Sequence, residues 1–188
     1  MSIFRKLINR LLHSEDEGLF RQIPLSVPGA LYVSPMPFGA YDPGDDLLKI
    51  YKHHAVNHVF VLVTDDELAR KSRRNLLKKY DAAHIAYSRF VLKDLIAPSL
   101  EVVHELTCAA RTMLNTERIV VHCHAGVGRT GIAVCCITMA VEGWSAETAI
   151  AHVSQFMTIN ITVDQRRCIK RYETFLAEYS ETSSETDG

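Results

Sequence analysis

Residues 118–131 have the sequence Arg-Ile-Val-Val-His-Cys-His-Ala-Gly-Val-Gly-Arg-Thr-Gly, and they predict a strand, a tight loop and the start of a helix. The apolar residues 119–121 favour a buried strand, and the apolar run from Ile132 to Glu142 favours a helix. Small residues at 125, 126 and 128 allow the loop to curl so that its backbone N–H groups converge on one anion. The N-terminus of the helix adds positive potential at the same point.

The loop places a cysteine six residues before an arginine. The positive potential favours the thiolate form of Cys123, which is the nucleophile. Arg129 supplies a planar guanidinium that can hold two phosphoryl oxygens at once, and Thr130 can donate its hydroxyl to the sulfur. A glycine-rich turn beside an ordinary half-buried thiol is the alternative, but the strand–loop–helix context favours a catalytic site.

The segment from His122 to Thr130 resembles the signature of the Cys-based protein tyrosine phosphatase superfamily: His-Cys, five residues, Arg, then Ser or Thr. We expect His122 to hold the loop through hydrogen bonds and His124 to line its rim. The predicted phosphate-binding residues are His124, Ala125, Gly126, Val127, Gly128 and Arg129.

Phosphoester cleavage also needs a proton for the leaving oxygen. Asp94 follows the predicted strand 84–90 and lies 29 residues before the nucleophile (123 − 94). Together with Pro98 it resembles the dual-specificity branch, which carries its general acid as Asp, three residues, Pro; the phosphotyrosine-only branch has Trp-Pro-Asp. Without that motif, a loop aspartate is more often a turn or cap residue. Lys93 is expected to be solvated.

Residues 159–168 resemble the last active-site loop of the family, where Thr162 and Gln165 would stand near the water of the second step. Ile161 occupies the place of the water-orienting Gln of the phosphotyrosine-only enzymes. For Gln165, an ordinary position at the N-terminus of a helix is an equally good interpretation.

Strands predicted at 30–33, 59–63, 84–90 and 118–121 alternate with helices, one of which begins at a Thr64–Glu67 capping box. This alternation indicates an α/β fold with a central, mostly parallel sheet and helices on both faces. Ligands of such sheets bind beyond the carboxyl ends of the strands, where Cys123 and Asp94 both fall.

One phosphatase-type domain is expected over residues 19–179. Residues 1–18 form a basic amphipathic helix (1–12) and a linker; this helix can contact a membrane surface or a partner, although covering its own domain is the favoured interpretation. The polar, acidic residues 180–188 are expected to be disordered.

Composition sets further bounds. The chain has 188 residues, 47% of them hydrophobic, and a net charge of −1, so we expect a monomeric domain with no nucleic-acid partner. No apolar run reaches about 20 residues, as a membrane span requires, and no signal peptide is evident. Five cysteines without metal-type spacing favour a reducing compartment, the cytoplasm. Cys135 and Cys136 are expected to be packing groups, and Cys108 is an open candidate for a resolving thiol.

The expected reaction is hydrolysis of phosphotyrosine and phosphoserine or phosphothreonine esters through a cysteinyl-phosphate intermediate, without metal or organic cofactor. Phosphorylated proteins or peptides are the expected substrates, since too few residues precede Ala30 for the extension that deepens the cleft of the phosphotyrosine-only branch. A phosphoinositide or RNA 5′-phosphate substrate is one alternative, although His124 and Val127 stand where lipid phosphatases have lysines. A catalytically silent phosphate-binding module is the other.

Overall fold

The computed structural model describes residues 18–185, with side chains up to residue 179, so the predicted helix at 1–12 lies outside the described residues. Its centre is a five-stranded sheet in the order β1-β2-β5-β3-β4. Only β1 runs antiparallel to its neighbour within this sheet. The strands are β1 (Arg21–Ile23), β2 (Ala30–Ser34), β3 (His58–Val61), β4 (Ala86–Arg89) and β5 (Arg118–His122).

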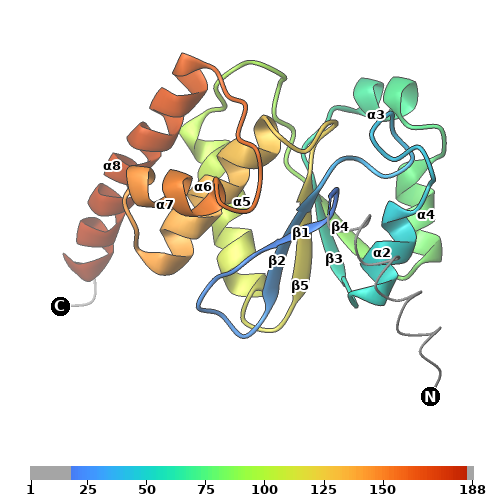
Figure 1. The fold of residues 1–188 in the computed structure, drawn as a ribbon. Coiled ribbons are helices and arrows are strands. Elements are labelled where there is room, and N and C mark those ends of the chain that lie inside the picture. Colours follow the sequence, from blue (N-terminus) through green and yellow to red (C-terminus); the bar gives the residue numbers. More distant parts are fainter. Residues whose placement is uncertain (1–17, 186–188) are drawn as a thin grey trace.

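Helices cover both faces of the sheet, as the alternation of elements predicts (Figure 1). On one side lie α2 (Leu47–His53), α3 (Asp65–Lys71) and α4 (Leu76–Ala82); on the other lie α5 (Leu100–Met113), α6 (Arg129–Glu142), α7 (Ala146–Val153) and α8 (Val163–Glu185). The expected α/β architecture with a mostly parallel sheet is therefore confirmed.

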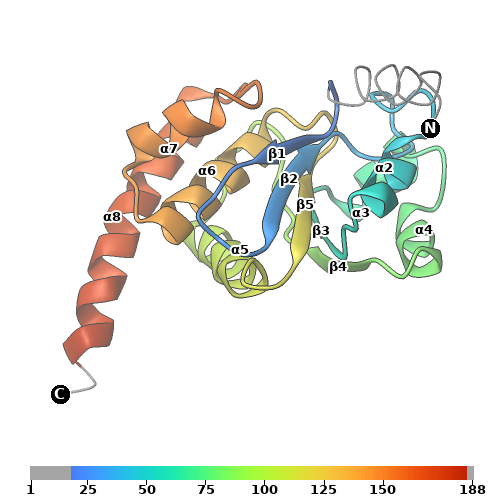
Figure 2. The same cartoon turned by 60° about the horizontal axis from the view of Figure 1, so that its bottom comes forward.

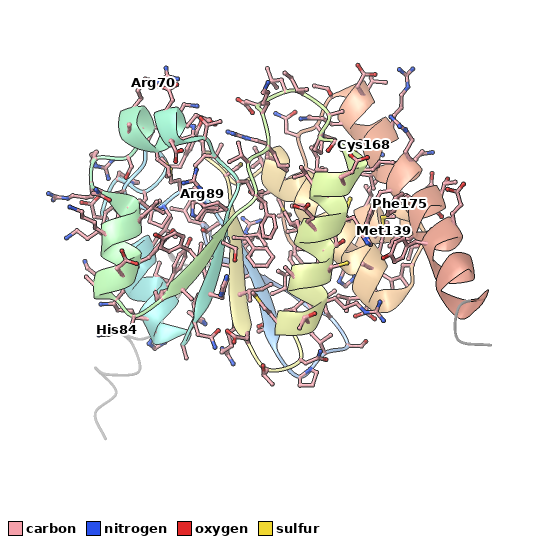
Figure 3. All side chains as sticks on the ribbon, turned by 180° about the vertical axis from the view of Figure 1, so that it is seen from behind. Arg70, His84, Arg89, Met139, Cys168 and Phe175 are labelled. Carbon is pink, nitrogen blue, oxygen red and sulfur yellow. The ribbon has the colours of Figure 1, made fainter. Side chains whose placement is uncertain are left out.

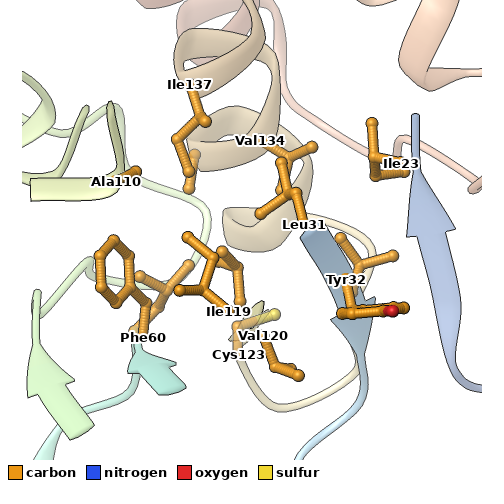
Figure 4. Close-up of a cluster of buried hydrophobic side chains, with 14 of the residues drawn as sticks. Ile23, Leu31, Tyr32, Phe60, Ala110, Ile119, Val120, Cys123, Val134 and Ile137 are labelled. Atoms are coloured by element: carbon orange, nitrogen blue, oxygen red, sulfur yellow. The ribbon is translucent and has the colours of Figure 1, made fainter. Parts of the chain in front are cut away.

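Strand β5 occupies the middle of the sheet and carries the site. It pairs in parallel with β2 on one side and with β3 on the other. Its side chains Ile119, Val120 and Val121 are fully buried, which explains the uninterrupted apolar run of a strand covered on both faces. Cys123 follows at the edge of this core (Figure 4). The middle of the sheet thus fixes the nucleophile's backbone.

Helix α6 follows the loop and is buried along most of its length. It contacts α5, α7 and α8 as well as β5, so an apolar sequence on all sides is the expected pattern. It begins at Arg129, three residues earlier than its apolar run, and ends at Gly143, whose φ of 69° is the left-handed conformation of a helix C-cap. The N-terminus of this long, buried helix therefore points at the loop.

Several local signals act as expected. Thr64 and Glu67 form the predicted capping box of α3, and Ser99 and Ser145 accept the N-cap hydrogen bonds of α5 and α7. Strand β1 has no counterpart in our predictions, because three residues are too few to show alternation.

The C-terminal tail differs from expectation. Helix α8 continues to Glu185, well into the segment that we expected to be disordered from Ser180 onward, and its far end extends beyond the sheet layers (Figure 2). A helix stabilised by earlier packed turns adds each further residue at little cost, and composition alone does not reveal this. Residues 186–188 lie outside the described part.

Candidate active site

Residues 123–128, here called the phosphate loop, connect β5 to α6. Gly126 has a φ of 77°, and a Cβ at this position would lie 2.7 Å from the Ser34 carbonyl oxygen. Its N–H donates to the Cys123 sulfur at 3.3 Å. The loop therefore requires glycine at position 126, both for its backbone conformation and for its close approach to β2.

Arg129 is nearly sealed from solvent, with 2% of its side chain exposed. Its Nη1 and Nη2 donate to the two carboxylate oxygens of Glu67 at 2.6 and 2.9 Å, and Nη1 also donates to the Leu92 carbonyl at 3.2 Å. Its Nε is buried and makes no hydrogen bond to any described residue. Because buried donors are almost always satisfied, this N–H is available for a phosphoryl oxygen.

Glu67 is the functional residue that our sequence analysis missed, since it recognised only the helix cap. The carboxylate also accepts from Thr64 N at 3.2 Å and from Lys71 Nζ at 3.0 Å. Burial alone would raise the pKa of Glu67, but the hydrogen bonds from Arg129, Lys71 and Thr64 outweigh it and lower the pKa to about 2. Glu67 therefore stays ionised and holds the guanidinium in one orientation.

Asp94 lies on the loop between β4 and α5, residues 90–99, here called the acid loop. The first part of this loop continues beside β3: Phe90 N donates to the Val61 carbonyl at 3.2 Å, and Leu92 N donates to the Leu62 carbonyl at 3.0 Å. The chain then turns and places Asp94 Oδ1 3.5 Å from Arg129 Nε. The structure thus brings together the predicted acid and the predicted arginine. The neighbouring Lys93 is exposed, as expected.

His122 lies directly behind the nucleophile and is fully buried. Its Nδ1 is 3.0 Å from the Cys123 carbonyl, and its Nε2 is 2.8 Å from the Tyr80 hydroxyl. Burial lowers the pKa of His122 to about 4, although the bond to the Cys123 carbonyl acts in the opposite direction. Since a carbonyl only accepts, the neutral ring carries its proton on Nδ1 and accepts from Tyr80 on Nε2. His122 therefore holds the loop through hydrogen bonds, as predicted.

The remaining loop residues have distinct surroundings. His124 is half-buried at the rim, with its ring 5.2 Å from that of Tyr41, and burial and the charge of Lys71 lower its pKa. The Val127 carbonyl accepts from Asn160 N at 3.1 Å. Thr130 is buried, but its hydroxyl has no hydrogen-bond partner among the described residues, so the expected bond to the Cys123 sulfur is not formed here. The peptide groups of Ala125 and Gly128 complete the loop.

Gln165 belongs to the first turn of α8 and is buried. Its Oε1 accepts from Thr162 N at 2.9 Å, and Thr162 Oγ1 accepts from Gln165 N at 3.2 Å, a reciprocal cap. Its Nε2 also donates to the Ile96 carbonyl at 3.3 Å. In addition, the Cys168 thiol (Figure 3) donates to the Pro98 carbonyl at 3.4 Å. Helix α8 thus holds the second half of the acid loop, while proximity of Gln165 to a water stays a prediction.

The other cysteines lie away from the reaction. Cys135 and Cys136 are fully buried in α6, as packing groups are. Cys108 is exposed on α5, eight residues past the helix start, which is about 12 Å along the axis from the end near the acid loop. Its sulfur lies beside the His104 ring, and its role as a resolving thiol stays a prediction.

The described residues contain neither a metal-binding cluster nor a helix that could span a membrane. Within residues 18–179, no group of three or more His, Cys, Asp or Glu side chains is placed to share a metal ion. None of the helices α2–α8 combines the length and apolar character that crossing a bilayer requires.

Comparison with known proteins identifies the class. The model of the family described as Tc-R-P, polymorphic toxin system, DSP-PTPase phosphatase, matches residues 40–142, more than half of the chain. The chain belongs to this family, and so to the dual-specificity and protein tyrosine phosphatase superfamily.

Curated relatives agree with this class. The protein tyrosine phosphatase domain-containing protein 1 of Danio rerio is 32% identical over 95 residues, which are 50% of this chain and 13% of the relative. The phosphatidylinositol 3,4,5-trisphosphate 3-phosphatase and protein-tyrosine-phosphatase PTEN2B of Arabidopsis thaliana is 26% identical over 153 residues, 73% of this chain and 24% of the relative. The matched region thus spans only a small part of these relatives.

Solved structures share the fold. Kinase associated phosphatase with its catalytic cysteine replaced by serine has a TM-score of 0.74 and 20% identity, covering 84% of this chain and 95% of that one. PTPMT1 in complex with PI(5)P has a TM-score of 0.71 and 17% identity, covering 86% and 99%.

Proposed function

We propose that this phosphatase hydrolyses phosphotyrosine and phosphoserine or phosphothreonine esters of proteins through a cysteinyl-phosphate intermediate. One observation carries the proposal: the Cys123 sulfur, the Arg129 Nε, which makes no hydrogen bond to a described residue, and the carboxylate of Asp94, 3.5 Å from that Nε, meet at the carboxyl end of β5. A nucleophile, an anion donor and an acid are the three groups that phosphate transfer to a thiolate requires.

In the first step the Cys123 thiolate attacks phosphorus in line with the ester oxygen. The S–P bond forms as the P–O bond breaks, and Asp94 gives its proton to the departing oxygen. Arg129 Nε and the loop N–H groups hold the other phosphoryl oxygens. In the second step the Asp94 carboxylate takes a proton from water, which attacks phosphorus. The S–P bond breaks, and phosphate and the thiolate are released.

The openness of the pocket supports a dual specificity. Asp94 lies beside Arg129 but leaves 59% of its side chain exposed, so the acid stands at the surface above the buried Cys123 and Arg129. A long aryl phosphate and a short alkyl phosphate can then both reach the sulfur. A cytoplasmic location is part of this proposal, because the mechanism needs a reduced thiol, and monomeric behaviour likewise stays a prediction.

A phosphoinositide is the second candidate substrate, favoured by the likeness to PTPMT1 in complex with PI(5)P and to the relative named as a phosphatidylinositol 3,4,5-trisphosphate 3-phosphatase. Two features of this chain favour protein instead. Lys71, the lysine near His124, is already paired with Glu67, and Val127 has no charge. The negative charges of additional phosphate groups would therefore meet few free positive charges near the phosphate loop.

A substrate panel tests the proposal with the full chain and with Cys123→Ser as the inactive control. We expect release of phosphate from phosphotyrosyl and phosphothreonyl peptides with kcat/KM values within about 100-fold of each other. A phosphoinositide preferred over every peptide by more than that margin would favour the second candidate. No turnover of p-nitrophenyl phosphate by the parent would indicate a silent binding module.

A further inference from the structure

Large hydrophobic side chains are exposed at seven positions in the described part of the chain: Leu19, Tyr41, Val91, Leu95, Ile96, Val163 and Tyr179. Five of them lie on the acid loop, at the start of α8 or against His124 of the phosphate loop, and we call this set the apolar rim: Tyr41, Val91, Leu95, Ile96 and Val163. Single exposed apolar residues are ordinary. Their concentration around one pocket marks an interaction surface.

The position of the rim follows from its neighbours in the sequence, which contact catalytic groups or the acid loop. Val91 precedes Leu92, whose carbonyl accepts from Arg129, and Leu95 directly follows Asp94. On α8, Val163 lies in the same turn as Gln165, which donates to the Ile96 carbonyl.

Tyr41 stands across the phosphate loop, with its ring against that of His124. The rim thus combines residues of the acid loop and of α8 with one residue that contacts the phosphate loop.

Leu95 gives an independent observation. Its φ is 60° and 70% of the residue is exposed. A branched side chain disfavours this left-handed conformation, in which glycine or asparagine is the low-cost choice. Solvent exposure means that packing within the chain does not compensate the strain. Strained, exposed residues beside catalytic groups are typical of ligand contacts.

Most cations of the segments that carry the rim have an acidic partner within the chain. These ion pairs are Lys71–Glu67, Arg89–Asp65 and Arg167–Asp164, and Arg73 and Arg74 share Asp45. On the acid loop itself, Lys93 and Asp94 have opposite charges. A surface that attracts anionic lipid or acidic peptide would carry an excess of unpaired cations. The rim offers apolar contact instead.

From these observations we infer that the apolar rim binds apolar residues that flank the phosphorylated residue in a protein segment. This inference rests on the proposed function and specifies its substrate: a phosphotyrosine or phosphothreonine with Leu, Ile, Val or Phe as immediate neighbours. The rim contacts do not change during the reaction. They therefore strengthen substrate binding and act mainly on KM.

The test compares two phosphotyrosyl peptides of equal length and charge, one with leucine and the other with serine at the two positions on each side. We expect the parent to favour the leucine peptide at least 10-fold in kcat/KM. Leu95→Asn, which suits the left-handed backbone, and Val163→Ser should each reduce this preference at least threefold, mainly through KM.

Tyr179→Ser is the matched control, because Tyr179 is also an exposed large hydrophobic residue but lies sixteen residues, about 24 Å, beyond Val163 along α8. It should keep the parent's preference. Turnover of p-nitrophenyl phosphate, which is too small to reach the rim, separates rim contact from damage to Asp94: a variant that lowers both activities equally acts through the acid loop and counts against the inference.

Two results distinguish the inference from the proposed function. Equal kcat/KM for the two peptides, at a normal rate, would overturn the inference and leave the function standing. Faster turnover of a phosphoinositide in phosphatidylcholine vesicles than of either peptide, with vesicle binding lost in Leu95→Asn, would mean that the rim meets a bilayer. That outcome would overturn both.

Discussion

At the scale of single residues, the site depends on how the charged guanidinium of Arg129 is stabilised in a position that is nearly inaccessible to water. An unpaired charge there would be strongly destabilising, and Glu67 prevents this by accepting from both Nη groups of Arg129. The pairing leaves Nε directed toward Asp94. Glu67 is therefore a positioning residue that acts through Arg129.

The variant Glu67→Gln separates this role from helix capping, because glutamine also completes a capping box. Loss of the charge leaves Arg129 without its counterion, so we expect unfolding to become easier by about 3 kcal/mol and kcat to fall at least 10-fold. Urea unfolding and turnover of p-nitrophenyl phosphate measure both. Thr64→Ala is the control: it removes the cap, at about 1 kcal/mol, and should leave kcat near the parent value. Equal effects of the two variants would contradict the assignment.

Asp94 makes a prediction about leaving groups. If it protonates the departing oxygen, Asp94→Asn should lower the rate by about 10²–10⁴ for a phosphate ester of a poor leaving group such as an alcohol or phenol. The loss should shrink for a leaving group that departs without a proton. A series of aryl phosphates of graded leaving-group basicity measures this dependence. An equal loss across the series would show that another group supplies the proton.

At the scale of elements, the acid loop is held from two sides. Strand β3 and the residue after it bind the beginning of the loop through the Val61 and Leu62 carbonyls, and α8 binds its end through Gln165 and Cys168. The turn that carries Asp94 lies between these attachments. Its position over Arg129 is thus set by elements distant in sequence.

Removing one attachment should loosen the loop without changing the reacting groups. We expect Gln165→Ala to lower kcat by about 3- to 10-fold and to shift the leaving-group dependence partway toward that of Asp94→Asn. Thr162→Ala is the matched variant, since it removes one bond of the reciprocal cap but keeps the amide that reaches the Ile96 carbonyl. If both variants behave alike, the effect comes from the helix cap and not from the tether.

These elements also show what the sequence could and could not predict. The residues from His122 to Thr130 are contiguous, so their signature was visible, and Asp94 followed from the strand before it and the proline after it. The bond between Glu67 and Arg129 joins residues 62 apart, and no local pattern encodes such a contact. The tether from Gln165 to Ile96 spans 69 residues, so capping alone was predictable. The strain at Leu95 was also invisible, because a leucine on a loop gives no sign in the sequence that its φ is left-handed.

At the scale of the whole molecule, β5 lies in the middle of the sheet and connects the buried core directly to the phosphate loop. The link is His122, the last residue of β5, whose ring bridges Tyr80 of α4 and the Cys123 carbonyl. A titratable group in this position couples global folding to pH.

The sign follows from the pKa of His122, which is about 4 in the folded protein and 6.5 in the unfolded chain. Because the unfolded chain binds the proton more tightly, the stabilisation is fully present above about pH 6.5 and is lost as the pH falls from there toward 4. The slope of the unfolding free energy approaches about 1.4 kcal/mol per pH unit inside this window, and the total is about 3 kcal/mol.

His122→Asn removes the titrating group but keeps an N–H in reach of the Cys123 carbonyl. The substitution removes the hydrogen bond to Tyr80, so we expect the variant to have a lower unfolding free energy than the parent at pH 7. The difference in unfolding free energy should narrow steadily as the pH falls to 4.5, because only the parent loses stability there. Urea unfolding at pH 7.0, 6.0, 5.0 and 4.5 gives both curves. His58 and His124, whose pKa values burial also lowers, remain in both proteins, so the difference between the curves isolates His122. Parallel curves over this range would mean that the pKa of His122 is the same in the folded and the unfolded protein, and that burial therefore does not lower it.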